Sequence, residues 1–346
     1  MGTPHRMNRD EFFGRISPLE PAGLRSVLWT LYWRGDAAMR ERIETELAVI
    51  RHGAAARKAA APVVDPGQVR LKVQDFVELA RSGAYFAGSR AVSPKERTRW
   101  RFTFKALADE VQRALRSPEP DEAFPAAEQL IELARDMNDT YYFRSEDPVE
   151  AARFVVSEMA AVLWTAVLRR SGFTEFAGSA ARQLIRWESR YGWTRYGSGA
   201  VATKEELLAD VVYGILPSPD AWNSFADAYL RALDGISAAT AARTGRKGNG
   251  ASPSGEAPGS RASRLARWHA MVVDRLMGGE REDLVDRLLT HPAISGVETD
   301  FVRAQWESRR GNLAAAQRTI QACLRKAPRQ AEFLEFAVTI GAAPAT

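Results

Sequence analysis

Apolar residues recur through most of this 346-residue chain at intervals of three and four, the spacing that gathers side chains on one face of a helix. Leu107, Val111 and Leu115 illustrate the pattern, each four residues from the next. No stretch shows the sustained alternation between turn signals that is typical of strands. We therefore expect an all-α protein, either a helical bundle or an α-solenoid of stacked helical hairpins. The pattern predicts helices near residues 9–16, 21–34, 37–52, 67–82, 94–116, 122–137, 148–170, 174–191, 204–215, 219–233, 262–277, 281–290, 298–310, 313–326 and 330–340.

Three helix starts carry clear capping signals. Ser93 and Asp147 each precede a proline and are each followed three residues later by a glutamate, and Thr203 has the same interval to Glu206. Side-chain oxygens at such positions accept hydrogen bonds from backbone N–H groups that the first helical turn leaves unpaired. The sequence therefore predicts helices that begin near residues 94, 148 and 204.

One change of composition divides the chain. Residues 237–263 consist mainly of Gly, Ser, Ala, Pro and basic residues and contain no large apolar side chain. Such a segment buries too little apolar surface to offset the entropy lost on ordering. We expect an all-α helical domain over residues 1–235, a disordered basic linker rich in Gly, Ser and Pro over residues 236–262, and a C-terminal helical domain over residues 263–346. Residues 53–66 form a milder break, but their alanines can continue a helix, so no boundary is predicted there.

The last helical hairpin has a recognisable layout. Gly311 can end one helix in the left-handed conformation, the small Ala316 lies five residues later, and Pro328 stops the next helix. Between them, Cys323 and Leu324 belong to the apolar stripe. From Phe301 to Pro328 this layout resembles one degenerate tetratricopeptide-type repeat, a helix–turn–helix unit that buries its apolar face by stacking on neighbours. The resemblance covers about 28 residues and implies a C-terminal tetratricopeptide-like domain that binds partners and performs no chemistry.

The residues that usually carry catalysis or metal binding form no constellation in the sequence. The four histidines are scattered, the single cysteine, Cys323, lies within a predicted packed helix, and no glycine-rich phosphate loop or nucleophile elbow is present. Acidic residues cluster between Asp136 and Glu150, where Asp147 already has a capping role. We predict no catalytic residues, no metal site and no cofactor. An enzyme whose site is assembled from distant residues is the third and least favoured alternative.

Two segments interleave arginine with aromatic residues. In the first, Trp100, Phe104 and Leu107 share one helical face, which is typical of a core. The second runs off a helix into a glycine loop, where aromatic and guanidinium groups can bind a peptide or stack on bases. The candidate binding residues of this second segment are Arg186, Arg190, Trp193, Arg195 and Tyr196.

These observations favour a non-enzymatic helical-repeat scaffold or adaptor that binds another, unidentified protein. The alternative is a nucleic-acid-binding protein that uses the arginine and aromatic surface. The distribution of the +5 net charge weakens this alternative, because residues 1–235 contain 32 basic and 32 acidic residues, against 16 and 11 in residues 236–346. Much of that excess lies in the predicted linker.

The sequence also predicts a compartment. The first ten residues show no apolar segment typical of a secretory signal, and a single cysteine allows no internal disulfide. The longest apolar stretch, residues 154–168, contains Ser157 and Glu158 and is too short to cross a bilayer. We therefore expect a cytoplasmic protein with no membrane partner.

Overall fold

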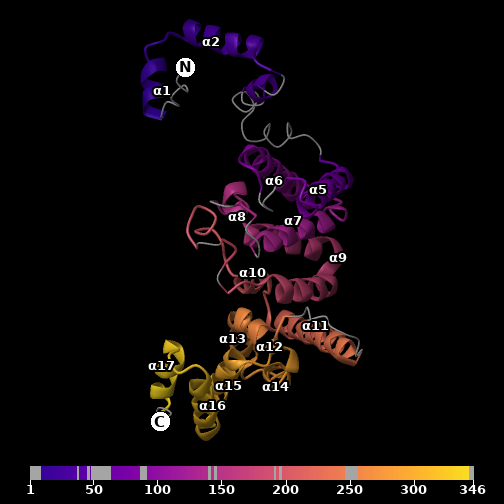
Figure 1. Cartoon of the computed structure of the whole chain (residues 1–346), viewed down its shortest axis with the longest axis vertical. Coiled ribbons are helices and arrows are strands. Elements are labelled where there is room, and N and C mark those ends of the chain that lie inside the picture. Colours follow the sequence, from indigo (N-terminus) through magenta and orange to yellow (C-terminus); the bar gives the residue numbers. More distant parts are fainter. Residues whose placement is uncertain are drawn as a thin grey trace. The chain divides into compact units, whose positions relative to one another are not determined.

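The computed structural model describes residues 9–36, 39–44, 47, 64–85, 92–138, 142–143, 146–190, 192–194, 197–245 and 256–342. The chain divides into two compact units, residues 1–63 and residues 64–346, and each is described by itself. Over the described ranges the chain forms α-helices, one 3₁₀ helix and no strand, which confirms the predicted all-α class. Figure 1 shows these helices in chain order.

The helices have the following bounds: α1 Arg9–Ile16, α2 Pro21–Arg34, α5 Pro66–Arg81, α6 Pro94–Leu115, α7 Ala123–Asn138, α8 Pro148–Ala152, α9 Val156–Trp187, α10 Leu208–Ile215, α11 Pro219–Gly245, α12 Pro258–Arg264, α13 Ala266–Leu276, α14 Asp283–Leu289, η1 Pro292–Ile294, α15 Val297–Arg309, α16 Leu313–Lys326 and α17 Ala331–Thr339.

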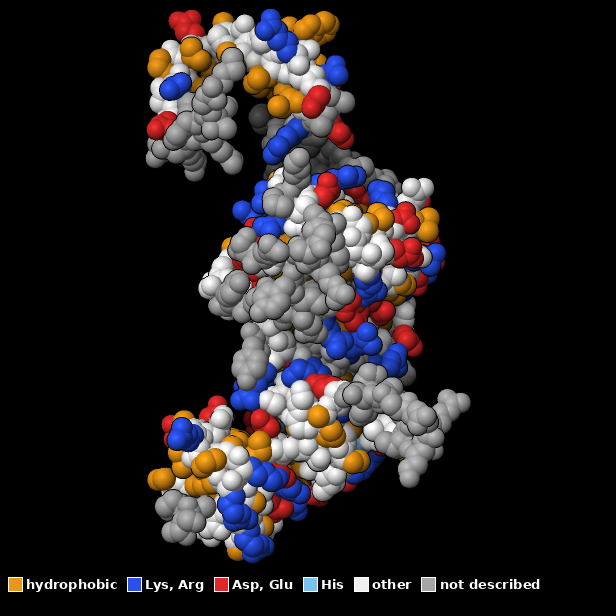
Figure 2. All heavy atoms as spheres, viewed as in Figure 1, with side chains coloured by type: hydrophobic (Ala, Val, Ile, Leu, Met, Phe, Trp, Pro, Cys, Tyr) orange, Lys and Arg blue, Asp and Glu red, His pale blue; other side chains and the backbone are white. Residues whose placement is uncertain are grey.

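The first unit exposes most of its large apolar side chains. Helix α2 has no buried residue, and Trp29 and Trp33 stack on each other with ring centroids 5.6 Å apart while Trp33 stays 70% exposed. Figure 2 shows hydrophobic side chains on the surface of this unit. The described helices of residues 1–63 therefore lack a core of their own.

The second unit contains one main core that begins at α5. Trp100 and Phe104 are fully buried, as their shared helical face predicts, and both rings contact Phe76 of α5. The predicted caps are confirmed at two helices. The Ser93 hydroxyl accepts from the N–H of Glu96, and the Asp147 carboxylate accepts from the first-turn N–H groups of α8.

The third predicted cap, Thr203, is wrong. Helix α10 begins at Leu208 because Glu205 makes a different contact: its carboxylate accepts hydrogen bonds from the N–H groups of Val156 and Ser157 at 2.6 and 3.1 Å and so caps α9. Glu188 in turn caps α10, accepting from the N–H groups of Leu208 and Ala209 at 3.2 and 2.7 Å.

Helix α9 covers what the sequence divides into two helices. It has a break at Gly172, where φ is +81°, a conformation that a residue with a Cβ rarely adopts. The second half of α9 then packs against α7 and α11. Gln183 from this half accepts a hydrogen bond of 2.7 Å from the buried indole N–H of Trp164 in the first half, which links the two halves across the break.

The core does not stop at the segment predicted to be a linker. Helix α11 continues to Gly245, so residues 236–245 are helical where the sequence predicts disorder; residues 246–255 lie outside the described ranges. On the other side of this segment, Trp268 of α13 stacks on Trp222 of α11 with centroids 5.5 Å apart, and His269 hydrogen-bonds to the Tyr229 hydroxyl at 2.9 Å.

The structure therefore draws the domain boundary differently from the predicted division into residues 1–235, 236–262 and 263–346. Buried residues from Val69 to Trp306 form one cluster, so helices on both sides of the predicted linker share a core. The division between compact units lies between Val63 and Val64, inside the alanine-rich break at residues 53–66. The prediction of a linker from residue 236 is wrong for residues 236–245, because alanine and serine continue α11 past its last large apolar residue.

Helices α15 and α16 form the predicted hairpin. Gly311 has a φ of +82°, and the N–H groups of Gly311 and Asn312 donate to the carbonyls of Ser308 and Glu307 in the pattern of a Schellman motif. Asn312 occupies the N-cap position of α16, but its side chain does not cap the helix. The side-chain amide donates to the Glu307 carboxylate at 2.7 Å instead. Ala316, Cys323 and Leu324 are buried as predicted.

Helix α15 joins two apolar clusters. Val302 and Trp306 belong to the main core, whereas Ala304 packs with α16 and α17 in a second cluster that includes Cys323 and Phe333. Helix α15 thus packs against neighbours on two of its sides.

Candidate protein-binding groove

Three helices at the C-terminal end of the chain recur at nearly equal intervals. Helices α13, α15 and α17 begin at Ala266, Val297 and Ala331. Helices α14 and α16 alternate with them. Helix α15 contacts both α13 and α16, and α16 contacts α17.

A groove of about 320 Å³ lies along these helices. Its lining combines apolar, amide and charged groups from α12, α13, α15, α17 and the segments that follow α9 and precede α10. The lining residues are Arg190, Leu207, Ser263, Arg264, Ala266, Arg267, Ala270, Glu298, Phe301, Val302, Gln305, Gln330, Glu332 and Phe333. This mixture of an apolar centre and polar margins is typical of peptide-binding surfaces.

Phe301 forms the apolar centre of the groove. Its ring lies 4.6 Å from that of Phe333, centroid to centroid, and makes an edge contact with Phe336 at 5.6 Å. Phe333 is buried, whereas Phe301 stays partly exposed. The helices therefore hold a rigid aromatic surface at the bottom of the groove.

Two side-chain amides in this groove form no hydrogen bond with another described residue. Gln305 of α15 and Gln330, at the N-cap of α17, are both partly exposed, and within the described part of the chain no group pairs with either amide. By contrast, Gln317 on α16 donates to the carbonyl of Ile340 at 2.8 Å. An amide offers both a donor and an acceptor, the complement of a peptide group.

The charged groups of the groove are held by ion pairs. Arg190 contacts Glu298 at 3.2 Å and also donates to the hydroxyl of Ser263, and Arg267 contacts Asp210 at 3.0 Å. These pairs leave the groove close to charge balance, so it does not present a strongly basic surface.

Of the five residues predicted to bind, the structure places one in the groove. Arg190 lines it. Arg186 lies elsewhere, on α9, where it forms a bidentate ion pair with Glu132. Trp193 is 4% exposed and belongs to the main core, so its indole is not available at the surface. Arg195 and Tyr196 lie outside the described residues.

Arg186 is part of a structural network. The hydrogen bond to Glu132 raises the pKa of the Arg186 guanidinium. Burial raises the pKa of Glu132, but the hydrogen bonds from Arg186 and Trp187 outweigh it and hold that pKa below its usual value. The indole N–H of Trp187 donates to the same carboxylate at 2.6 Å. This network fixes α9 on α7.

Gln305, Gln330 and Phe301 were not predicted from the sequence as binding residues. Glutamine is ordinary on helix surfaces, and Phe301 reads as one more apolar residue of a helical stripe. The signal that could have found them is the near-equal interval between the starts of α13, α15 and α17, which places positions of α15 and α17 on one surface.

The histidines, cysteine and carboxylates of the described ranges were predicted to form no metal site. No three His, Cys, Asp or Glu side chains converge there in a geometry that could hold a metal ion. Burial lowers the pKa of His269 to about 3, so the imidazole is neutral near pH 7. Its contact with the Tyr229 hydroxyl lies inside the core, away from the groove.

No family model, curated protein or solved structure matches this chain. Across the helices that are described, none is long and apolar enough to pass through a bilayer.

Proposed function

We propose that the protein is a non-enzymatic helical-repeat scaffold or adaptor that holds an extended segment of a partner protein in the groove between α13, α15 and α17. The observation that carries the proposal is the pair of unpartnered amides, Gln305 and Gln330, beside the partly exposed ring of Phe301. Amides that have no partner within the described fold are available to hydrogen-bond the backbone of a bound peptide.

The recurrence of helices supports the same proposal. The spacing between the starts of α13, α15 and α17 is close to the length of one tetratricopeptide-type repeat. The α15–α16 hairpin also ends its first helix with the glycine expected from the sequence. Stacked hairpins of this kind bind peptides along the surface formed by the first helix of each repeat. We place this binding in the cytoplasm, since the single cysteine is unpaired.

The chemistry of the groove defines the segment it would take. An apolar or aromatic side chain of the partner would contact Phe301, while the two amides would bind peptide groups on either side. The balanced ion pairs of Arg190 and Arg267 give no strong preference for an acidic or a basic segment.

The test is selection of binding peptides from a displayed random library on the full chain, followed by affinity measurement with the selected peptides. Gln305→Ala should weaken binding about fivefold, because it removes one neutral hydrogen-bonding group. Gln321→Ala is the matched control: Gln321 lies on α16, outside the groove, and should leave the affinity unchanged. Failure to select any peptide, or peptides indifferent to Gln305→Ala, would contradict the proposal.

A further inference from the structure

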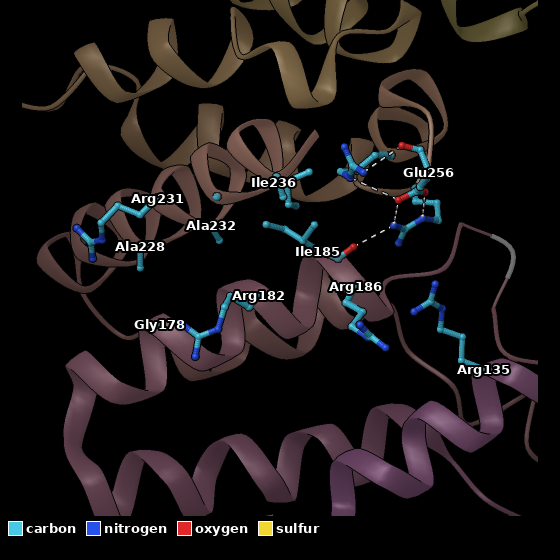
Figure 3. A pocket seen from close by; sticks show the side chains of 14 residues that line it. Arg135, Gly178, Arg182, Ile185, Arg186, Ala228, Arg231, Ala232, Ile236 and Glu256 are labelled. Carbon is cyan, nitrogen blue, oxygen red and sulfur yellow. Dashed lines mark hydrogen bonds and ion pairs between the residues drawn. The ribbon is translucent and has the colours of Figure 1, made fainter. Parts of the chain in front are cut away.

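A second and larger cavity, of about 710 Å³, lies between the second half of α9, α11 and α12. Its volume is typical of sites that hold small molecules. Figure 3 shows Ala228, Ala232 and Ile236 along the side of α11 that faces α9, with Arg135 and Arg186 at one end. Figure 2 shows Lys and Arg side chains gathered where α9 meets α11.

The lining of this cavity is strongly basic. It contains six arginines and a single carboxylate, that of Glu256. The arginines are Arg135, Arg182, Arg186, Arg231, Arg261 and Arg264. A concentration of one sign of charge in a hollow with apolar walls raises the local concentration of counter-ions.

Four of these arginines are already engaged by the fold. Arg264 contacts Glu256 through two bonds of 2.6 and 2.7 Å, and Arg261 contacts the same carboxylate at 3.4 Å. Arg186 and Arg135 both contact Glu132. These contacts fix the walls of the cavity.

The other two arginines, Arg182 of α9 and Arg231 of α11, form no hydrogen bond or ion pair with any described residue. Arg182 also faces a neighbouring hollow and lowers the pKa of Glu128, although burial dominates there and leaves that pKa raised. Two guanidinium groups from facing helices are thus available at one cavity, and guanidinium is the side chain best matched to phosphate oxygens.

The floor of the cavity is apolar and made of small residues. Gly178, Ala228, Ala232 and Gly235 leave room between the helices, and Ile185 and Ile236 cover the floor. At Gly235 an added Cβ would meet no atom within 4 Å, so the space next to this residue is open.

We propose that this cavity binds a small phosphate monoester whose organic part is apolar or aromatic. Arg182 and Arg231 would bind the phosphate dianion. The organic part would contact Ile185, Ile236 and the alanines of α11. Of the residues that line this cavity, only Arg264 also lines the peptide groove.

The experiment is calorimetric titration of the full chain at pH 7.5 with 1-naphthyl phosphate and, separately, with inorganic phosphate. The expected result is saturable binding of both, with 1-naphthyl phosphate about tenfold tighter because its ring leaves water for the apolar floor. The double variant Arg182→Gln/Arg231→Gln should weaken both probes at least about tenfold, since it removes two charge-assisted contacts.

Two further variants separate charge from shape. Gly235→Leu places a side chain in the open space and should weaken 1-naphthyl phosphate while leaving inorganic phosphate within about twofold. Arg318→Gln/Arg325→Gln removes two exposed positive charges from α16, outside the cavity, and should change neither affinity. Circular dichroism and the melting temperature of each variant report that the fold is retained.

Three outcomes would overturn the proposal. Equal weakening by both double variants would show only a general attraction to positive charge. A folded chain that binds neither probe would show that the cavity is not a phosphate site. Capture of a single-stranded RNA oligonucleotide that depends on Arg182 and Arg231, with no binding of 1-naphthyl phosphate, would assign the surface to nucleic acid instead.

Discussion

At the scale of single residues, partly or fully buried carboxylates connect segments that are distant in the sequence. Glu188 accepts hydrogen bonds from the N–H groups of Leu208 and Ala209, Glu205 from those at the start of α9, and Glu150 from those of Ala200 and Val201. Each carboxylate accepts hydrogen bonds from backbone N–H groups that have no partner within their own helix or turn. Such caps cannot be read from a local pattern, because the acceptor lies about 20 to 50 residues from the donors.

Glu188 should make stability depend on pH. Burial raises the pKa of its carboxyl to about 7, against the opposing effect of three backbone N–H groups, whereas the ordinary value is 4.5. The folded state therefore holds a proton that the unfolded state releases between about pH 4.5 and 7, so this contribution is full below that range and is lost as pH rises through it. As pH rises through this window, the free energy of unfolding of the wild type, measured with urea, should fall by up to roughly 3 kcal/mol relative to that of Glu188→Gln.

Comparing the two proteins at each pH removes the contribution of His269, which has the opposite sign. Its lowered pKa destabilises the folded state as pH falls below 6.5 in both proteins alike. Glu175→Gln, which removes an exposed carboxylate from α9, is the matched control. If the free energy of unfolding depends on pH in the same way for the wild type and Glu188→Gln, burial does not raise the pKa of the Glu188 carboxyl.

Cys323 should be unreactive in the folded protein. The side chain is 1% exposed, and burial raises the pKa of its thiol to about 11. Since the thiolate is the reacting species, labelling with a disulfide reagent at pH 8 should be at least about 100-fold slower in buffer than in denaturing urea. Equal rates in the two solvents would mean that α16 opens readily from α15 and α17.

At the scale of elements, the turn between α15 and α16 depends on the conformation of one glycine. Gly311 has a φ of +82°, and no atom within 4 Å would obstruct a Cβ, so only the backbone conformation disfavours a side chain. Gly311→Ala should therefore lower the free energy of unfolding by about 1 kcal/mol, measured by urea denaturation.

Gly235→Ala is the contrasting control. Gly235 lies in the helical interior of α11 with open space next to it, so alanine should raise the free energy of unfolding by about 0.5 to 1 kcal/mol. If Gly311→Ala and Gly235→Ala change the free energy of unfolding in the same direction, the left-handed conformation of Gly311 is not the reason that glycine is favoured there.

The same scale shows what the sequence could and could not predict. Periodicity placed α15 and α16 within one residue of their observed ends, because both helices have a strong apolar stripe and clear stop signals. It placed the start of α10 four residues too early, because Glu205 and Glu206 read as a first helical turn while Glu205 caps another helix. The sequence predicts Trp193 as a binding residue because it lies in a loop, but its side chain is buried in the main core.

At the scale of the whole molecule, a continuous core replaces the predicted two-domain division. The core cluster runs from Val69 to Trp306 and includes helices on both sides of residues 246–255. Composition alone cannot show this, because contacts such as that of Trp222 with Trp268 join segments that no local pattern connects.

Three fragments of the chain test this organisation. Residues 64–346 alone should unfold cooperatively, with a free energy of unfolding within about 1 kcal/mol of the full chain, because the described helices of residues 1–63 bury no side chain. Residues 64–245 and 256–346, expressed separately, should each lack a cooperative melting transition, since each exposes half of the α11–α13 contact.

Scanning calorimetry of the three fragments is the measurement. A sharp melting transition in either of the two shorter fragments would support the predicted division into two domains joined by a linker. A large loss of stability in residues 64–346 would show that the N-terminal helices contribute to the core.

The Trp222–Trp268 contact also has a consequence for synthesis. As the chain leaves the ribosome, α11 emerges before α13, and until α13 follows, Trp222, Phe225 and Tyr229 have no Trp268 to cover them. Until α13 emerges, the nascent chain exposes this row of aromatic side chains, the kind of surface that holding chaperones bind. Pausing of translation after α11 has left the ribosome but before α13 has followed would lengthen that exposure and increase aggregation of a chain whose final fold is unchanged.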